Sequence, residues 1–358
     1  MEPTSTVSIK IARGFLAALF AVNVYRAITQ SVTVGEALNY TAFIGPPWTE
    51  ALSRFDGNNH VLNTLLVRIS TSRFHLTELS LRLPSLLAGV FYLWVVFRMA
   101  RRWFGNGMMF LFVTALLTLN PMIVDAMSEA RGYGMALACW MWALELLLES
   151  AESFSVQKLN LAGLCLGLSV AASLAFAAPA AALLGVYLLW SRGSEDPRGA
   201  ARNLVLIAVL AAFVLLVIPL NRAEWKTLAA GATSLRQTIN ELTALSLGTS
   251  LEVIGAISRI AVALVALGGV AAAISRWRQR DAALVALAGP TLALTLLLLL
   301  AAHRWRHTPF PQEGAIYLIP LLVLTVAAGI LKLNSRPAQI GFVFGSALVL
   351  ACQLAAFP

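Results

Sequence analysis

Long apolar runs recur along the whole chain, and they constrain its fold more than any other feature. Each run is roughly 17 to 22 residues long, which lets a helix rising 1.5 Å per residue cross a hydrocarbon core of roughly 30 Å. Of the 358 residues, 59% are hydrophobic and only 12% are charged, whereas soluble domains are about a quarter charged. The sequence therefore predicts an all-α fold, a polytopic bundle of transmembrane helices.

We expect about 10 to 11 membrane spans by this length criterion. They cover residues 11–29, 83–99, 108–124, 132–149, 159–173, 175–190, 204–220, 252–273, 282–302, 315–331 and 340–357. The fifth and sixth are the shortest and meet at Ser173. The first is expected to remain as an anchor, because it contains Asn23 and Arg26 and no small-residue cleavage site follows it. We expect one transmembrane domain over residues 1–358, without a separate soluble domain at its C-terminus.

The positions of lysine and arginine predict the orientation of the chain. Cytoplasmic loops keep positive charge, and more than half of the 26 basic residues fall in short segments on the side of the N-terminus. These are Lys10, Arg13, Arg98, Arg101, Arg102, Lys158, Arg192, Arg198, Arg202, Arg276, Arg278, Arg280, Lys332 and Arg336. We therefore expect a cytoplasmic N-terminus in a bacterial inner (plasma) membrane, with loops 30–82, 221–251 and 303–314 outside. Because the basic residues are scattered, no nucleic-acid partner is predicted.

The sequence lacks the common signatures of soluble enzymes and metal centres. Cys139, Cys165 and Cys352 all lie within apolar runs, so neither a disulfide framework nor a metal cluster is predicted. No Gly-rich phosphate loop or nucleophile elbow is present. Charged residues within the spans are few, with Glu145 and Arg259 near span ends, which favours chemistry at the membrane surface over transport through the bundle.

The first outer loop, residues 30–82, is long enough to carry structure of its own. In LNTLLVRISTSRF, Leu62, Leu65, Leu66 and Ile69 share one face at helical spacing, and Asn63, Thr64, Arg68 and Ser70 share the other. This pattern predicts a helix lying in the interface with its apolar face towards the lipid. PPWTEALSRF, which opens with two prolines, predicts a second such helix.

Four motifs in chain order then place polar side chains at the outer ends of the spans. They are TVGEALNY with Glu36, DGNNHVLNTLL with His60, LRLPSLLAG with Arg82, and DAMSEARGYGMAL with Asp125, Glu129, Arg131 and Tyr133. Together these motifs, over about residues 1–150, resemble the GT-C glycosyltransferases of the protein O-mannosyltransferase and aminoarabinose-transferase type.

The resemblance implies transfer of a sugar from a polyprenyl-phosphate carrier to an acceptor on the non-cytoplasmic face. It also implies that Glu36 is the general base and that Arg131 binds the lipid phosphate. His60, Arg82, Glu129 and Tyr133 are expected to bind substrate. The family often has Asp-Glu where this chain has Gly35-Glu36. Either Glu36 serves alone, or the chain is catalytically degenerate.

Transfer of a sugar from a phosphate carrier to a hydroxyl requires the same residue types. A hydroxyl is a poor nucleophile, so a carboxylate must take the acceptor proton. An arginine fork can stabilise the charge that develops on the departing phosphate, and Glu129 or Asp125 would orient that arginine.

Each of these residues could instead have a purely structural role. Arg131 could anchor a helix end or pair with Glu129, and Arg82 could be a headgroup anchor. Glu36 could be a solvated loop acid, and His60 a locally bonded residue at a helix start. Tyr133 fits an aromatic belt equally well.

A second basic loop, HRWRHTPFPQEG at residues 303–314, departs from the positive-inside pattern. Its Arg304 and Arg306 are predicted to meet an anionic partner, with contact to lipid headgroups as the alternative. We predict no cofactor. A divalent metal held by Glu36, Asp56 and phosphate oxygens remains an alternative, because hard cations bind carboxylates.

The preferred prediction is thus a membrane glycosyltransferase, with membrane lipids and a polyprenyl-phosphate-linked sugar as partners. The rival is a carrier or lipid transporter that has the same fold and binds polyprenyl phosphate without transfer. Gly35, where the family often has an acid, supports this rival.

Overall fold

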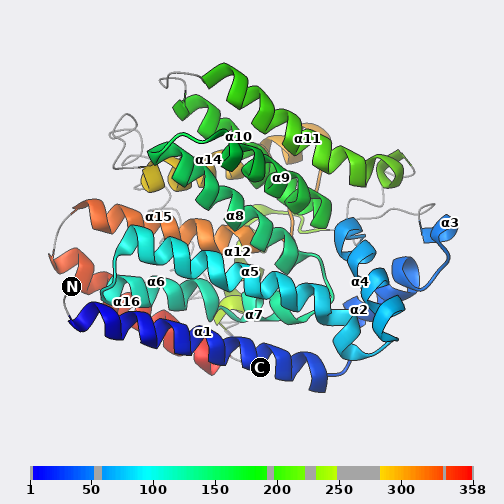
Figure 1. The fold of residues 1–358 in the computed structure, drawn as a ribbon, viewed down its shortest axis with the longest axis horizontal. Coiled ribbons are helices and arrows are strands. Elements are labelled where there is room, and N and C mark those ends of the chain that lie inside the picture. Colours follow the sequence, from blue (N-terminus) through cyan, green and yellow to red (C-terminus); the bar gives the residue numbers. More distant parts are fainter. Residues whose placement is uncertain are drawn as a thin grey trace.

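The structure is a computed structural model, and it describes residues 3–51, 59–191, 197–221, 231–247, 283–333 and 336–356. Within these ranges the fold is helical, and an isolated β-bridge joins Ala232 to Phe310. The helices lie mostly side by side along the long axis of the molecule (Figure 1). This confirms the predicted all-α bundle.

The longest helices form the body of the bundle. Their bounds are α1 (Pro3–Thr29), α5 (Glu78–Phe104), α8 (Tyr133–Glu152), α11 (Pro197–Asn221), α14 (Ala283–Arg306), α15 (Leu318–Leu333) and α16 (Arg336–Ala355). Each belongs to a stretch long and apolar enough to cross a membrane. α8 lies at the centre, where Trp140, Met141 and Leu144 are fully buried.

The remaining predicted spans are short, broken or not described. The predicted helix over 108–124 is instead two helices, α6 (Met108–Thr118) and α7 (Pro121–Ser128), which meet at 58°. The break occurs because Asn120 caps Met122 N and Pro121 has no N–H to continue the helix. Two shorter apolar helices, α9 (Val156–Ala172) and α10 (Ala177–Trp190), flank η2 (Leu174–Phe176), and Ser173 ends α9 as predicted. The predicted span 252–273 lies outside the described residues.

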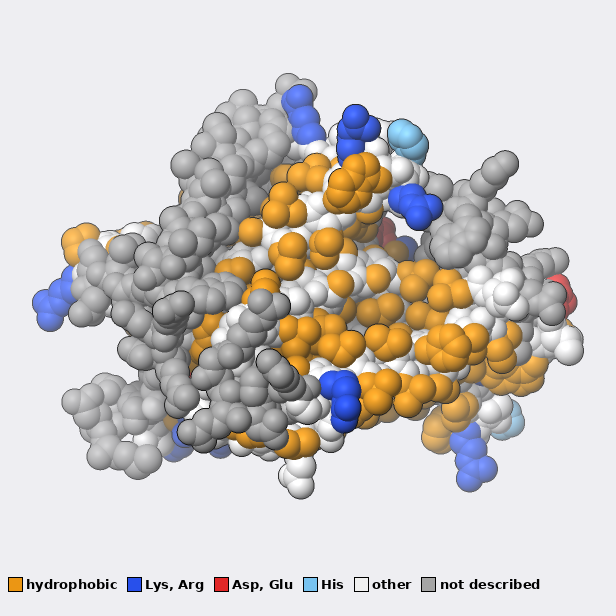
Figure 2. All heavy atoms as spheres, turned by 90° about the horizontal axis from the view of Figure 1, so that it is seen from above, with side chains coloured by type: hydrophobic (Ala, Val, Ile, Leu, Met, Phe, Trp, Pro, Cys, Tyr) orange, Lys and Arg blue, Asp and Glu red, His pale blue; other side chains and the backbone are white. Residues whose placement is uncertain are grey.

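The outer surface of the bundle is apolar. On the face in Figure 2, hydrophobic side chains cover most of the described area, and lysine and arginine lie mainly at its margins. On α11, the side chains of Leu206, Val209, Phe213 and Val214 are all more than half exposed. Such a surface suits lipid rather than water, and the chain is an integral membrane protein.

An ion network joins three helices at the end of the bundle predicted to be cytoplasmic. Glu149 of α8 lies 3.0 Å from Arg102 of α5 and 3.0 Å from Lys158 of α9, and it also pairs with Arg98. Its side chain is almost fully buried. The charges within this part of the bundle therefore compensate one another.

The first outer loop folds into short helices at one end of the bundle, around α2 and α4 in Figure 1. They are α2 (Val34–Asn39), the π-helix η1 (Tyr40–Ile44), α3 (Trp48–Ala51) and α4 (Val61–Phe74). α4 confirms the first predicted surface helix. Of the second, only α3 is described, and residues 52–58 lie outside the described ranges.

The polar face of α4 points inwards, which corrects the predicted orientation of its polar side chains. Asn63, Thr64 and Ser70 are buried, whereas Leu66 and Ile69 are exposed as expected of a lipid-facing surface. The reason is hydrogen bonding to the bundle. Asn63 donates to Ala130 O, and Ser70 donates to Ser80 O. α4 is thus fixed by polar contacts on its inner side.

The C-terminal part adds two outer elements beside α7. They are α12 (Leu235–Leu247) and the 3-10 helix η6 (Glu313–Tyr317), which leads into α15. Both contact α7 and each other. They bring the outer loops after residue 230 against the loop between α7 and α8.

Candidate functional site

Glu36 belongs to the N-terminal turn of α2 and forms a reciprocal capping box with Thr33. Thr33 N donates to Glu36 Oε2 at 2.8 Å, and Glu36 N donates to Thr33 Oγ1 at 3.3 Å. A Thr followed three residues later by Glu is the sequence signature of this cap. The TVGE motif therefore starts a helix and fixes the direction of the Glu36 side chain.

The Glu36 carboxylate is fully buried and accepts hydrogen bonds on both oxygens. Arg82 Nε and Nη2 donate at 2.8 and 2.7 Å, and Ala130 N donates at 2.7 Å. Burial opposes ionisation, but the hydrogen bonds from Arg82, Ala130 and Thr33 together hold the pKa of Glu36 below its usual value. With four donors on two oxygens and no exposed surface, this carboxylate has no access to an acceptor hydroxyl. The geometry favours a structural role over the predicted role of general base.

Arg82 also has all its donors bound within the protein, and this geometry favours a structural role over its predicted role in substrate binding. Its remaining donors reach the carbonyl oxygens of Gln30 at 2.7 Å, Ser31 at 3.0 Å and Ala27 at 3.3 Å. All five N–H groups of the guanidinium thus have protein partners. Arg82 of α5 thus joins the end of α1 to α2 inside the fold, and Glu36 joins the same cluster to the α7–α8 loop through Ala130 N.

The end of α7, the start of α8 and the loop between them carry the polar side chains that do reach a cavity. Asp125, Glu129, Arg131 and Tyr133 line a cavity of about 100 Å³ together with Glu313 of η6, and Met122, Ala126, Leu245 and Ile316 complete its walls. Other backbone segments approach this loop too closely for larger residues. A Cβ on Gly132 would lie 2.2 Å from Ala172 O, and one on Gly134 would lie 2.0 Å from Ala126 O. The two glycines in ARGYG allow this close approach.

Arg131 is the cation at the centre of this cavity. It forms an ion pair with Glu313, lies 3.9 Å from Glu129, and its guanidinium carbon is 5.1 Å from the centroid of the Tyr133 ring. A quarter of its side chain is exposed. Unlike Arg82, it therefore presents part of its guanidinium to the cavity, where an anion could bind.

Glu129 is the least constrained carboxylate in the cavity. Asp125 is bonded to Arg26 and Glu313 to Arg131, whereas among the described residues none donates a hydrogen bond to the Glu129 side chain. Burial raises the pKa of Glu129 to about 7, helped by the charges of Asp125, Glu36 and Glu313 and opposed by Arg131. Glu129 is therefore poised between its charged and neutral forms near neutral pH.

Gly35 faces the guanidinium of Arg131, which lines the cavity. A Cβ at this position would lie 3.4 Å from Arg131 Nε. An acid at residue 35 would thus be placed beside Arg131, whereas Glu36 points away into its buried ion pair. In this chain, the first loop supplies no carboxylate to the cavity from either position.

His60 lies behind the cavity and does not line it. Its Nδ1 is 3.0 Å from Ala172 O, and its ring packs edge-on against Tyr133 at 4.6 Å between centroids. Burial and the charge of Arg131 lower the pKa of His60 to about 4. His60 is therefore neutral at pH 7 and supports Tyr133, whose ring in turn contacts Arg131.

The structure does not bring every predicted residue to the site. Arg304 and Arg306 are exposed at the end of α14 and do not line the cavity. Asp56, which was predicted as a possible metal ligand with Glu36, lies outside the described residues. Across the described ranges, no cluster of three or more His, Cys, Asp or Glu side chains forms a metal-binding group.

Sequence reasoning missed Glu313. It closes the basic 303–314 loop, and its pairing with Arg131 joins positions 182 residues apart in the chain. The available signal was a single acid in a loop otherwise rich in cations. The expected carboxylate partner of Arg131 was Glu129 or Asp125, but Glu129 is more distant and Asp125 pairs with Arg26.

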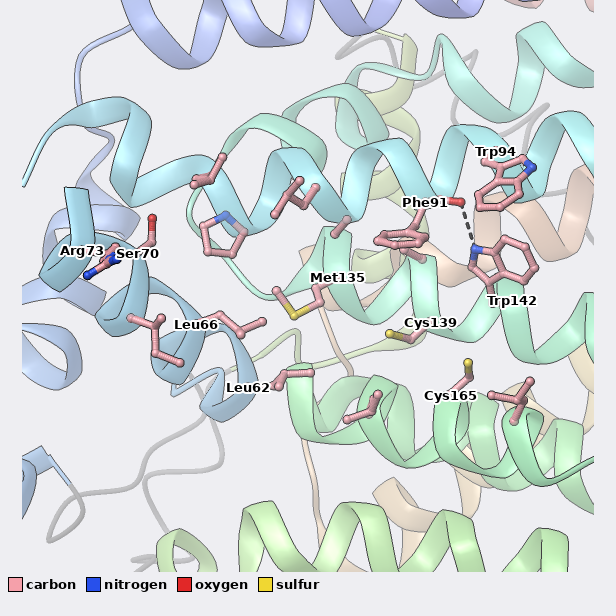
Figure 3. Close-up of a pocket in the computed structure, with 18 of the residues that line it drawn as sticks. Leu62, Leu66, Ser70, Arg73, Phe91, Trp94, Met135, Cys139, Trp142 and Cys165 are labelled. Atoms are coloured by element: carbon pink, nitrogen blue, oxygen red, sulfur yellow. Dashed lines mark hydrogen bonds between the residues drawn. The ribbon is translucent and has the colours of Figure 1, made fainter. Parts of the chain in front are cut away.

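An apolar groove of about 740 Å³ lies between α4, α5, α8 and α9. α5 and α9 form its walls, α8 its floor, and α4 lies at one end (Figure 3). Arg73 and Ser70 mark the α4 end, and Trp94 and Trp142 mark the other. Its lining between these ends includes Leu62, Leu66, Phe91, Met135, Cys139 and Cys165. Met135 lies in the first turn of α8, four residues after Arg131.

The chain is similar to known proteins both in sequence and in fold. The dolichyl-phosphate-mannose-protein mannosyltransferase family matches residues 61–220. Two crystal structures of ArnT from Cupriavidus metallidurans, in the apo state and bound to undecaprenyl phosphate, each superpose with a TM-score of 0.57. The chain has the fold of ArnT. The resemblance to the GT-C glycosyltransferases predicted from the sequence is thereby confirmed.

The extent of the match to ArnT is limited in two ways. Sequence identity is 16% and 18% for the two structures, and 96% of this chain is covered in each case. The match covers 63% and 64% of the ArnT chain, so this chain spans less than two thirds of its length. Among curated proteins, none matches the sequence.

Proposed function

We propose that the protein is a membrane glycosyltransferase that moves a sugar from a polyprenyl-phosphate donor to an acceptor on the non-cytoplasmic face. The observation that carries this proposal is the partly exposed Arg131 in a cavity lined by carboxylates, in a fold shared with ArnT. Arg131 holds the donor phosphate and stabilises the charge that develops as the sugar leaves.

The hydrocarbon part of the donor binds the apolar groove between α5, α8 and α9. Its lining is almost entirely apolar, and it lies close along α8 to the turn that carries Arg131. An isoprenoid chain has no polar group to satisfy, so burial of apolar surface alone favours its binding there. The acceptor and the sugar would then meet at the cavity beside Arg131.

A carrier that binds polyprenyl phosphate without transfer is the second candidate. Two observations favour it, the absence of an acid at Gly35 and the complete burial of Glu36. Both candidates require Arg131 to bind the lipid phosphate. They differ in whether a carboxylate in the cavity accepts a proton from an acceptor.

The proposed orientation places the N-terminus in the cytoplasm of a bacterial plasma membrane and the cavity outside. Single cysteines at Glu50 and Arg304, in a variant without the native cysteines, should both react with a membrane-impermeant maleimide added to intact cells. A cysteine at Arg101, at the opposite end of α5, should react only after permeabilisation. Labelling of Arg101 from outside would reverse the proposed topology.

Binding of polyprenyl phosphate to the purified protein in nanodiscs tests the proposed function. We expect saturable binding, and tighter binding by Glu313→Gln, because the phosphate competes with the Glu313 carboxylate for Arg131. Glu313 is partly exposed, so the gain should be modest, up to about fivefold for a pair worth about 1 kcal/mol.

Glu241→Gln is the matched control, because Glu241 lies near η6 through its contact with Gln312 but does not line the cavity. Its affinity should equal that of the unmodified protein. Absence of saturable binding in the unmodified protein would reject both the transferase and the carrier. Transfer of sugar to an added acceptor preparation would distinguish the first from the second.

A further inference from the structure

Neither Glu36 nor Gly35 of the first loop brings a proton acceptor to the cavity, but another carboxylate in the cavity is suited to this role. Glu36 is fully buried with donors on both oxygens, and position 35, whose Cβ would face Arg131, is glycine. A transferase with this geometry needs another group within reach of the acceptor hydroxyl, because the hydroxyl must lose its proton as it attacks.

We propose that Glu129 is the general base of this chain. The inference rests on the proposed glycosyltransferase function and assigns the proton-accepting step at that same site. Glu129 lines the cavity, lies 3.9 Å from Arg131, and has a side chain that is one quarter exposed. It is therefore close to the proposed phosphate position and accessible to an acceptor.

Two of the other carboxylates near the cavity stay engaged when the donor binds, because Asp125 is bonded to Arg26 and Glu36 is paired with Arg82. Glu313 is paired with Arg131 until the donor phosphate takes its place, so Glu313→Gln, which should keep transfer, separates it from Glu129. Within the described ranges, the Glu129 side chain accepts no hydrogen bond, so its oxygens are available to a ligand. A base needs such a free lone pair, whereas a structural carboxylate uses its lone pairs within the protein.

The surroundings of Glu129 also match the requirement for proton transfer near neutral pH. It follows the last residue of α7, where the negative end of the helix dipole disfavours a carboxylate charge. The charged or titratable groups that act on it or share its cavity are Asp125, Glu36, Glu313, Arg131, Arg82 and Tyr133. Burial and the neighbouring acids raise its affinity for a proton, and Arg131 limits that rise.

The step balances without a further reactant. The acceptor oxygen forms a bond to the anomeric carbon of the sugar, and the bond from that carbon to the phosphate oxygen breaks. The electron pair of the broken bond leaves with the polyprenyl phosphate, whose charge Arg131 stabilises. The acceptor proton passes to Glu129 and afterwards to solvent through the exposed part of its side chain.

Glu129→Gln tests the proposal, because it preserves shape but cannot accept the proton. We expect the transfer rate constant to fall at least about a hundredfold, while donor affinity stays within about threefold. Glu78→Gln, an exposed acid at the start of α5, is the control and should retain full activity. Gly35→Asp in the Glu129→Gln background should restore transfer, because it places a carboxylate beside Arg131, and Gly35→Asn should not.

The pH dependence of the unmodified protein provides a measurement that needs no variant. The value of kcat/KM, which reports the free protein, should be level above pH about 7 and should fall towards tenfold per unit below it, because burial and neighbouring acids raise the pKa of Glu129. A value of kcat/KM that stays level well below neutral pH would overturn the proposal.

Transfer and donor binding, measured separately, test Glu129 and the transferase activity independently. Full transfer by Glu129→Gln would remove Glu129 as the base and leave the transferase in place. Loss of donor binding in that variant would assign Glu129 to recognition and also overturn the inference. Donor binding without any transfer by the unmodified protein would reject the transferase itself, and the base with it, in favour of the carrier.

Discussion

Replacing Glu36 by glutamine is expected to destabilise the folded protein by about 3–5 kcal/mol, because the change leaves the buried Arg82 charge without its counter-ion. The amide also cannot accept the bonds from Arg82, Ala130 and Thr33 on both of its terminal atoms. Arg82→Ala should have a comparable effect, since it leaves the Glu36 carboxylate buried and removes the contacts to three carbonyl oxygens. Thermal unfolding in detergent measures both.

Glu78→Gln is the control for these variants, because Glu78 is exposed and acts on Arg82 only through its charge, so its loss should lower the unfolding temperature far less. The Glu36 contribution also has a defined pH dependence. Its folded-state pKa is below its ordinary value of 4.5, so the contribution is complete above that pH and is lost as the pH falls through the lowered value. Wild-type stability of Glu36→Gln with loss of transfer alone would restore Glu36 as the general base.

Arg131→Ala is expected to remove binding of polyprenyl phosphate while leaving the fold nearly intact. Loss of a paired charge at a phosphate costs on the order of 2 to 5 kcal/mol, which weakens binding by at least about thirtyfold. Arg131→Lys should also weaken binding, because a point charge does not replace a bidentate fork. The measurement is donor binding in nanodiscs together with the unfolding temperature.

Arg306→Ala provides a matched control for Arg131. Arg306 is an exposed arginine that the sequence predicts at an anionic partner, but the structure leaves it outside the cavity. We expect its removal to leave donor affinity unchanged. Equal loss of binding in both variants would indicate a general electrostatic effect, and unchanged binding in Arg131→Ala would reject Arg131 as the phosphate ligand.

Most of the fold could be predicted from the sequence because membrane spans and surface helices depend on local patterns. Apolar runs of sufficient length locate the main helices, and the 3.6-residue period of LNTLLVRISTSRF predicts α4. The break between α6 and α7 was also encoded locally, by Asn120 and Pro121, but the apolar run continues through it and conceals it. Hydropathy alone therefore gave one span where the chain bends.

The candidate site was less predictable, since its contacts join distant parts of the chain. The motifs located Glu36, Arg82 and Arg131. No sequence pattern shows that Glu36 and Arg82, 46 residues apart, form a buried pair of hydrogen bonds with each other. The orientation of α4 has the same cause. Asn63 faces inwards because Ala130 O is there to accept its hydrogen bond, and that contact exists only in the folded chain.

A structure of the protein with polyprenyl phosphate bound would show whether Arg131 holds the lipid phosphate. We expect the phosphate within hydrogen-bonding distance of Arg131, with the Arg131–Glu313 pair separated and the isoprenoid chain in the groove between α5, α8 and α9. We also expect Glu36 and Arg82 to keep their mutual contacts. A phosphate bound elsewhere, with Arg131 still paired to Glu313, would contradict this role of Arg131.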